Sequence, residues 1–253
     1  MCSTTLVALA SDSKETEEKN NNTAIIEQAL ALDETIKLSD KAFTVISMVE
    51  EDVGYSTRGQ SNLAIQSINE TNGIVEVTTI HPYKVTKDNE LVNSFDYIAG
   101  KTRAGGEYTF PLVDTTVTVK VYYYDTGLSY VNLFSFYRPL GVQAYWSSNN
   151  STVSVSKLNV KFDSMGDLHR YPECMSQNMN TTLIQEDYQH INKINVNNPL
   201  KNQIHVSTDA MMDSERVLCF TDGFNHGGIV RVEATYKVNG VNRTYGHSYD
   251  AYL

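Results

Sequence analysis

The chain has 253 residues, a net charge of −10 and a charged fraction of 20%. Its 20 Lys and Arg residues form no dense run, which excludes nucleic-acid binding through clustered cations that displace phosphate counterions. No stretch approaches the roughly 20 apolar residues of a membrane helix, so we expect no membrane insertion of the mature chain.

The chain opens with an apolar run that is typical of a secretory signal peptide. Residues 1–10 end in Leu6–Ala10, which closes with the small-x-small pattern that signal peptidase recognises. We therefore expect a signal-peptide remnant, cleavage after Ala10, and a secreted, extracellular protein. Residues 11–23 are charged and Asn-rich, and we expect them to be a disordered polar spacer because they bury too little to offset their ordering entropy.

Residues 24–58 are predicted to form an N-terminal extension of the main body. Apolar residues recur at helical spacing in Ala24–Leu32, which predicts a short helix that must dock on other elements to be stable. Phe43–Val49 predicts a strand. Arg58-Gly59 lies in a polar segment that we interpret as either a surface loop or a processing site.

Period-two alternation of apolar and polar residues dominates residues 59–253. The turn sequences Asn72-Gly73 and Asn239-Gly240 suit two-residue hairpins, because both residue types tolerate positive φ. The second turn predicts three cross-strand pairs: Val238 with Val241, Tyr236 with Arg243, and Ala234 with Tyr245.

Two polar regions of the body predict interruptions of the strands. Asp163–Gly166 has the composition of a turn, and residues 172–214 are Asn-rich with little alternation. For the latter we expect long loops and a short helix near Leu183–Tyr188. The predicted fold is all-β, an antiparallel β-sandwich (one large or two small, dividing near residues 148–151) with a short N-terminal helix.

Three cysteines are present, and cleavage of the leader would remove Cys2. In an oxidising compartment the remaining pair, Cys174 and Cys219, predicts a disulfide. The alternative is that both are buried thiols that pack as small apolar residues.

Motifs for common enzyme chemistries are absent from the sequence. It contains no Walker A loop, no Gly-x-Gly-x-x-Gly and no Gly-x-Ser-x-Gly elbow. The six His residues are scattered without metal-ligand spacing. We therefore expect no cofactor and no metal, and the sequence leans against an enzyme.

An aromatic-rich segment predicts a binding surface, because exposed rings on a sheet stack on sugars or anchor a protein partner. The first functional hypothesis is thus a secreted, non-enzymatic binding protein that recognises a glycan or a cell-surface protein. The candidate ligand-binding residues are Tyr122, Tyr124, Tyr130, Tyr145 and Trp146.

Two alternatives belong to other functional classes. An exported hydrolase would use a Gly-rich segment with Asp222 and His226, joined by His247, as an acid–base set. A cysteine nucleophile paired with a histidine would compete with the disulfide for Cys174 or Cys219. A third hypothesis, a secreted toxin or bacteriocin-like factor, follows from export and small size alone.

Overall fold

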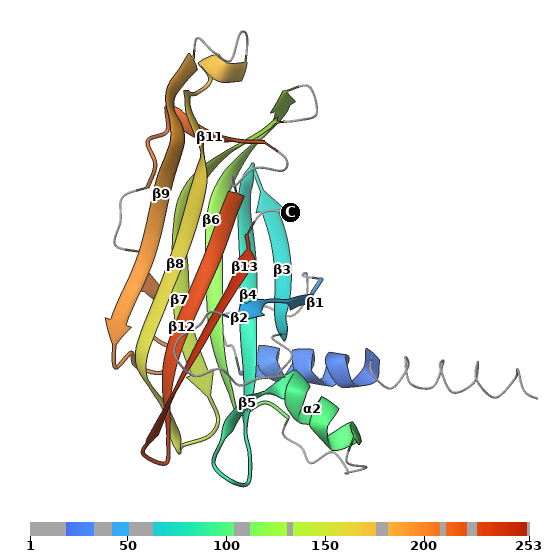
Figure 1. The fold of residues 1–253 in the computed structure, drawn as a ribbon. Helices are drawn as coiled ribbons and strands as arrows, with labels where there is room; N and C mark the ends of the chain where they lie inside the picture. Colours follow the sequence, from blue (N-terminus) through green and yellow to red (C-terminus); the bar gives the residue numbers. More distant parts are fainter. Residues whose placement is uncertain are drawn as a thin grey trace, which may run out of the picture.

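The computed structural model describes residues 19–32, 42–50, 63–103, 112–130, 134–175, 182–207, 211–221 and 227–251. Within these ranges thirteen antiparallel strands form one hydrogen-bonded sheet in the order β1-β3-β4-β6-β7-β11-β8-β12-β13-β2, with β5, β9 and β10 paired to β4, β8 and β7 (Figure 1). The elements are β1 (Thr44–Ser47), β2 (Val49–Glu50), β3 (Leu63–Thr71), β4 (Ile74–Val85), β5 (Leu91–Asn93), α2 (Ser94–Arg103), β6 (Thr115–Tyr130), β7 (Phe134–Ser148), β8 (Val153–Arg170), the 3-10 helix η1 (Glu173–Met175), β9 (Leu183–Asn197), β10 (His205–Val206), β11 (Arg216–Thr221), β12 (Gly227–Val238) and β13 (Val241–Asp250).

The sheet folds back on itself into two layers, which confirms the all-β, sandwich-like fold. One layer contains β3, β4, β6 and β7, and the other contains β9, β8, β12 and β13 (Figure 1). Tyr83 of β4 packs on Tyr236 of β12 and Tyr245 of β13, with ring centroids 5.2 and 5.4 Å apart. The Tyr245 hydroxyl also donates a hydrogen bond to the carbonyl of Leu91 in the facing layer.

Short connections close both sides of the sandwich. At one side β11 pairs with both β7 and β8, and so belongs to both layers. At the other side β1 pairs with β3 and β2 pairs with β13, while Met48 between them is buried in the core. Residues 149–152 connect β7 directly to β8, so the strands before and after this connection belong to the same fold.

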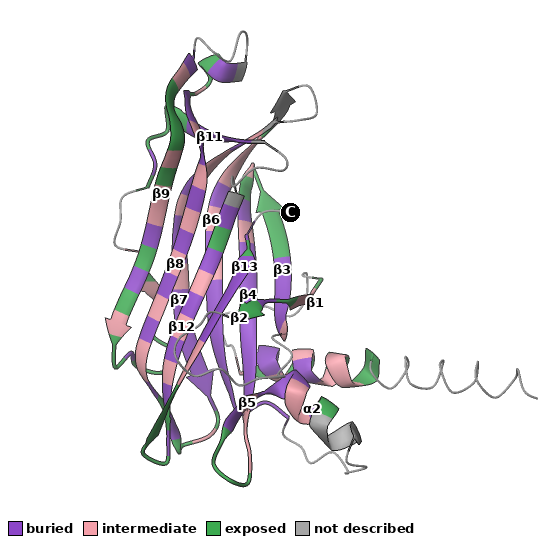
Figure 2. Cartoon of the chain, in the orientation of Figure 1, coloured by how far each residue is buried: buried purple, intermediate pink, exposed green. Residues whose placement is uncertain are grey.

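Alternation along the long strands places their apolar side chains between the layers. In β12 the even-numbered residues from Val230 to Val238 are all buried, and the odd-numbered residues between them are partly or fully exposed. The same stripes of buried residues run along β8 (Figure 2). Because successive side chains of a strand point to opposite faces, one layer of β-branched and aromatic residues fills the core.

The N-terminal helix spans residues 19–31 and packs on the outer face of the sheet. Its Ile25 and Ala29 are fully buried against a cluster that includes Ile65 and Ile80. The predicted helix is therefore present, but it begins at Lys19 and takes in the last five residues assigned to the spacer. Docking on an apolar face explains how such a short helix is stable.

A second helix, α2, covers the same outer face and is not predicted from the sequence. Asn93 caps it, since the Asn93 Oδ1 accepts a hydrogen bond from the Phe95 N–H at 3.0 Å. Phe95 and Ile98 pack into the cluster around the N-terminal helix. The N-terminal helix is also linked to the segment before β6, because the side-chain Oε1 of Gln28 accepts a hydrogen bond from the backbone N–H of Leu112 at 2.6 Å.

Both predicted hairpins form, and the second has the predicted register. Asn239 and Gly240 have φ of 47° and 88°, and the three predicted pairs across this turn are present. Asn72 and Gly73 have φ of 54° and 76°. A Cβ on Gly73 would lie 2.8 Å from the Tyr124 ring, so this glycine serves both the turn and the packing.

The turn predicted at Asp163–Gly166 is wrong, because β8 runs through it without interruption. Gly166 is required there for another reason. A Cβ at this position would lie 2.6 Å from the carbonyl oxygen of Cys219 and 2.9 Å from the Phe220 ring. The glycine thus allows β11 to approach β8 closely.

The loops and short helix predicted for residues 172–214 are also wrong over much of that range. Residues 183–197 form β9, which pairs with β8 alone. Because β9 is an edge strand, most of its side chains are exposed or partly exposed on both faces. An edge strand of this kind lacks the alternation that identifies a half-buried strand.

Candidate binding groove

The structure divides the predicted aromatic residues between two faces of one layer. Tyr123 is buried in the core, where its ring meets Tyr137 edge-on at 5.3 Å. Its neighbours Tyr122 and Tyr124 are half-buried on the opposite face, as alternation predicts. The Tyr122 hydroxyl donates to Gln143 Oε1 at 3.3 Å. Burial, together with nearby Glu76, raises the pKa of Tyr122, so this hydroxyl stays protonated.

Tyr124 belongs to a small cluster with Arg138 and Tyr171. The Arg138 guanidinium carbon lies 4.8 Å from the centroid of the Tyr124 ring and 5.8 Å from that of Tyr171. The two tyrosine rings meet edge-on at 6.3 Å. Arg138 thus makes a cation–π contact with the Tyr124 ring.

The remaining predicted residues lie elsewhere. Tyr145 is buried, with 2% of its surface exposed, and the side chain of Tyr130 lies outside the described residues. Trp146 is buried with 5% exposure and faces the core, away from Tyr122 and Tyr124. Trp146 also lines a groove.

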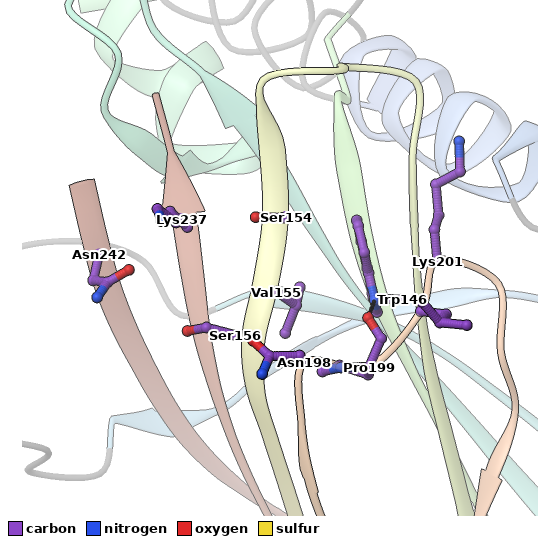
Figure 3. Close-up of a pocket in the computed structure, with 10 residues that line it drawn as sticks. Trp146, Ser154, Val155, Ser156, Asn198, Pro199, Lys201, Lys237 and Asn242 are labelled. Atoms are coloured by element: carbon purple, nitrogen blue, oxygen red, sulfur yellow. Dashed lines mark hydrogen bonds between the residues drawn. The ribbon is translucent and has the colours of Figure 1, made fainter. Parts of the chain in front are cut away.

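The groove has a volume of about 450 Å³ and lies near the turn of the β12–β13 hairpin. Asn242 and Lys237 of that hairpin form one side of it, and Pro199 and Lys201 form the other (Figure 3). The ten lining residues are Trp146, Ser154, Val155, Ser156, Asn198, Pro199, Leu200, Lys201, Lys237 and Asn242.

One wall of the groove is the strap, which we define as residues 198–204 between β9 and β10. Hydrogen bonds attach it to both layers. The indole Nε1 of Trp146 donates to the carbonyl of Pro199 at 3.0 Å, and the Asn202 N–H donates to the Trp146 carbonyl at 2.9 Å. The Asn198 N–H donates to the Ser156 carbonyl at 2.8 Å.

The conformation of the strap depends on its asparagines. Asn198 and Asn202 have φ of 49° and 61°, in the left-handed region that asparagine tolerates better than other non-glycine residues. The Asn-rich composition that misled the prediction of loops is thus explained by the bends at the end of β9. The strap could have been found from the sequence as a pair of asparagines that flank a proline.

The charge of the groove differs from that of the whole protein. Two lysines line it, and no Asp, Glu, His or Cys is among its ten lining residues. The chain as a whole has a net charge of −10. The Lys201 ammonium donates to the Ser148 carbonyl at 3.3 Å, and Lys237 is exposed. The groove therefore offers hydrogen bonds and positive charge, but no carboxylate or imidazole for acid–base catalysis.

The structure does not contain the predicted disulfide between Cys174 and Cys219, both of which are buried. They pack with Phe136 and Val217 in one apolar cluster, as the alternative interpretation of buried thiols described. Burial raises the pKa of Cys174 to about 11 and that of Cys219 to about 12. Both thiols are protonated at neutral pH, which disfavours a cysteine nucleophile.

Of the three residues in the hydrolase hypothesis, the structure describes His247. Asp222 and His226 lie outside the described residues. His247 is buried between the layers, stacked on His81. Within the described ranges, no group of three or more His, Cys, Asp and Glu is placed to hold a metal ion.

Comparisons with known proteins supply no relative for this chain. No family model, no curated protein and no solved structure matches it. Among the described helices, none is both long and apolar enough to cross a membrane.

Proposed function

We propose that this protein is a non-enzymatic binding protein that takes a glycan in the groove beside Trp146. The single observation that supports this best is the set of lining side chains. Hydroxyls, amides and two ammonium groups surround a tryptophan and a short apolar floor, without a carboxylate or imidazole. Such a surface binds polar ligands but lacks the groups that hydrolysis requires.

The chemistry of the groove favours sugars that carry a negative charge. Ser154, Asn198 and Asn242 are exposed and can donate to or accept from sugar hydroxyls. Lys201 and Lys237 on opposite sides favour a carboxylate or sulfate substituent on the ligand. The acidic surface elsewhere would repel such a ligand, so binding would concentrate at the groove.

A glycan array of neutral and acidic oligosaccharides tests this function. We expect binding to acidic members, and a loss of about tenfold in affinity for Lys237→Ala and for Asn242→Ala. Lys19→Ala, which removes an exposed lysine from the N-terminal helix, is the matched control and should bind as the wild type does.

Two results would contradict the proposal. One is wild-type protein that binds no array member. The other is equal binding by the wild type, Lys237→Ala and Asn242→Ala, which would place the contact elsewhere. Capture of a cell-surface protein by the wild type, without glycan dependence, would favour the protein-partner form of the original hypothesis.

We further propose that the protein acts outside the cell, on the grounds of the apolar run that ends at Ala10. The intact mass of natively expressed protein tests this, with a chain that begins at Ser11 as the expected result. Retention of residues 1–10 in protein from the cytosol would contradict export.

A further inference from the structure

Two histidines face each other between the layers of the sandwich, and neither lines the groove. His81 lies on β4 and His247 on β13. Their ring centroids are 6.0 Å apart and their planes differ by 15°, so the rings are stacked. The ring of Tyr249 lies 5.8 Å from that of His81 and adds a third ring to the cluster.

Both histidines are buried, and at least one ring nitrogen of each lacks a hydrogen-bond partner among the described residues. His81 has 1% of its surface exposed, and neither of its ring nitrogens has a hydrogen-bond partner among the described residues. His247 has 6% exposed, and its Nδ1 has no such partner either. An unpaired polar group in a water-free interior destabilises the fold, and a charged one destabilises it much more.

Among the side chains that the structure describes, the buried ones of the neighbouring strands carry no charge opposite to that of a protonated pair. The inward-facing titratable side chains of β4, β12 and β13 near the histidines are tyrosines: Tyr83, Tyr236, Tyr245 and Tyr249. The facing residues of β3 and β6 are uncharged, and include Ala64, Gln66, Val117 and Val119. In β2, Glu50 lies opposite His247 in the register, and its side chain lies outside the described residues, so Glu50 enters the tests below.

The cost of charging the pair is correspondingly high. Burial, and secondarily the charge of His247, lowers the pKa of His81 to about 3. Burial lowers the pKa of His247 to about 4. Below the ordinary histidine pKa of 6.5, an opened chain binds protons that the closed sandwich cannot accept. Two imidazolium rings at 6.0 Å would also repel each other.

The pair lies beside the weakest connection between the layers. β2 pairs with β13 at two positions, His247 with Glu50 and Ser248 with Val49. β1 pairs with β3 at four positions on the other side of Met48. By contrast, β12 pairs with β13 at ten positions. Separation of the layers at β2 therefore breaks few hydrogen bonds.

We propose that His81 and His247 form an acid-sensitive latch, whose protonation releases β2 from β13 and separates β13 from β4. At neutral pH the latch is closed. In an acidic environment it opens, while the β8–β12 pairing persists. Neither histidine of the latch lines the groove, so the latch does not require the proposed ligand.

An acid titration of the full chain tests the latch. Near-UV circular dichroism follows the packing of the tyrosines around the pair. We expect a transition in the wild type between pH 6.5 and 4, and a midpoint lower by about one pH unit or more in His81→Phe/His247→Phe. The partly exposed His205 supplies the matched control, and His205→Phe should keep the wild-type midpoint. Equal midpoints in the wild type and the double variant would overturn the proposal.

Two measurements keep the test decisive if the double variant does not fold. Histidine NMR of the wild type should show both rings neutral until the transition. Titration of either ring near pH 6.5 in folded protein would overturn the latch. Hydrogen exchange, corrected for its intrinsic pH dependence, should accelerate at pH 5 in β2 and at its partners His247 and Ser248 of β13, but not in β8. Uniform acceleration would indicate global unfolding and contradict the latch.

Glu50→Gln tests whether the acid transition comes from the histidines or from Glu50, the acidic residue that lies opposite His247 in the register. If the histidines drive opening, this variant keeps the wild-type midpoint within a few tenths of a pH unit. A shift as large as that of the double histidine variant would assign the transition to Glu50 and overturn the proposal.

Discussion

The β12–β13 hairpin and the edge strand β9 belong to the same layer but differ in how they are stabilised. β12 lies between β8 and β13, and its even-numbered side chains are buried in the core. β9 pairs with β8 alone, and only two of its fifteen residues, Asn192 and Ile194, are buried.

The difference shows that alternation in a sequence reports burial and not extended conformation itself. A strand whose one face is packed must alternate, because each misplaced polar group would lose its hydration. A strand at the edge is held by backbone pairing, which any residue except proline provides. β9 therefore has a mixed polar sequence that resembles a loop.

The largest expected contrast comes from Tyr236→Ala in β12. Tyr236 is fully buried and packs on Tyr83 and Tyr245, so we expect a loss of about 3–5 kcal/mol in the free energy of unfolding. Ile184→Ala in β9, at a side chain that is 42% exposed, is the control and should cost about 1 kcal/mol or less. Urea denaturation measures both, and equal losses would break the distinction between the two strands.

The pH dependence of stability is the second contrast. The folded-state pKa of His247 is about 4, below its unfolded value of 6.5. The free energy of unfolding is therefore highest above pH 6.5 and declines as the pH falls toward 4, because the unfolded chain then binds a proton that the folded chain does not. We expect about 2 kcal/mol lost between pH 7 and pH 5 from this residue, and as much again from His81.

The control is a histidine in the edge strand. His190→Phe in β9 should leave most of the pH dependence unchanged, because β9 pairs with neither β4 nor β13 and His190 is not part of the stacked pair. His247→Phe should remove roughly half of the loss, as measured by urea denaturation at the two pH values. A pH dependence that His247→Phe does not reduce would contradict the assignment.

Gly240→Ala tests the turn that sets the hairpin register. Gly240 has φ of 88° with open space around it, so a Cβ adds backbone strain and no clash. We expect a cost of about 1–2 kcal/mol in thermal or urea unfolding. Val241→Ala, at the exposed residue beside the turn, should change stability by less than about 0.5 kcal/mol.

The smallest effect is expected at the exposed apolar positions of β9. Ile184 is 42% exposed, and Ile184→Thr keeps a β-branched side chain while it removes apolar surface. We expect a change within about 0.5 kcal/mol. A loss of 2 kcal/mol or more would mean that β9 contributes to a packed face, and the contrast with β12 would not hold.

Part of the candidate site could be predicted from the sequence. Trp146 was a predicted binding residue, and it lines the groove. The lysines and the strap were not predicted, because Lys201 and Lys237 come from segments far apart in the sequence. Neither residue has a local pattern that distinguishes it from a solvated surface lysine.

The sequence by itself determined the features that depend on neighbouring residues. The Asn-Gly turns, the register of the β12–β13 hairpin and the docking helix follow from backbone preferences and from periodic burial. These features can be recognised from neighbouring positions, although the helix still needs its docking face to be stable.

Only the tertiary structure decided what distant strands do to one another. Three features arise where separate strands meet. They are the contact of β11 with Gly166, the burial of both cysteines without a disulfide, and the stacking of His81 on His247. The physical reason is that packing and desolvation act between residues that are close in space, and local sequence patterns do not show which distant residues come close.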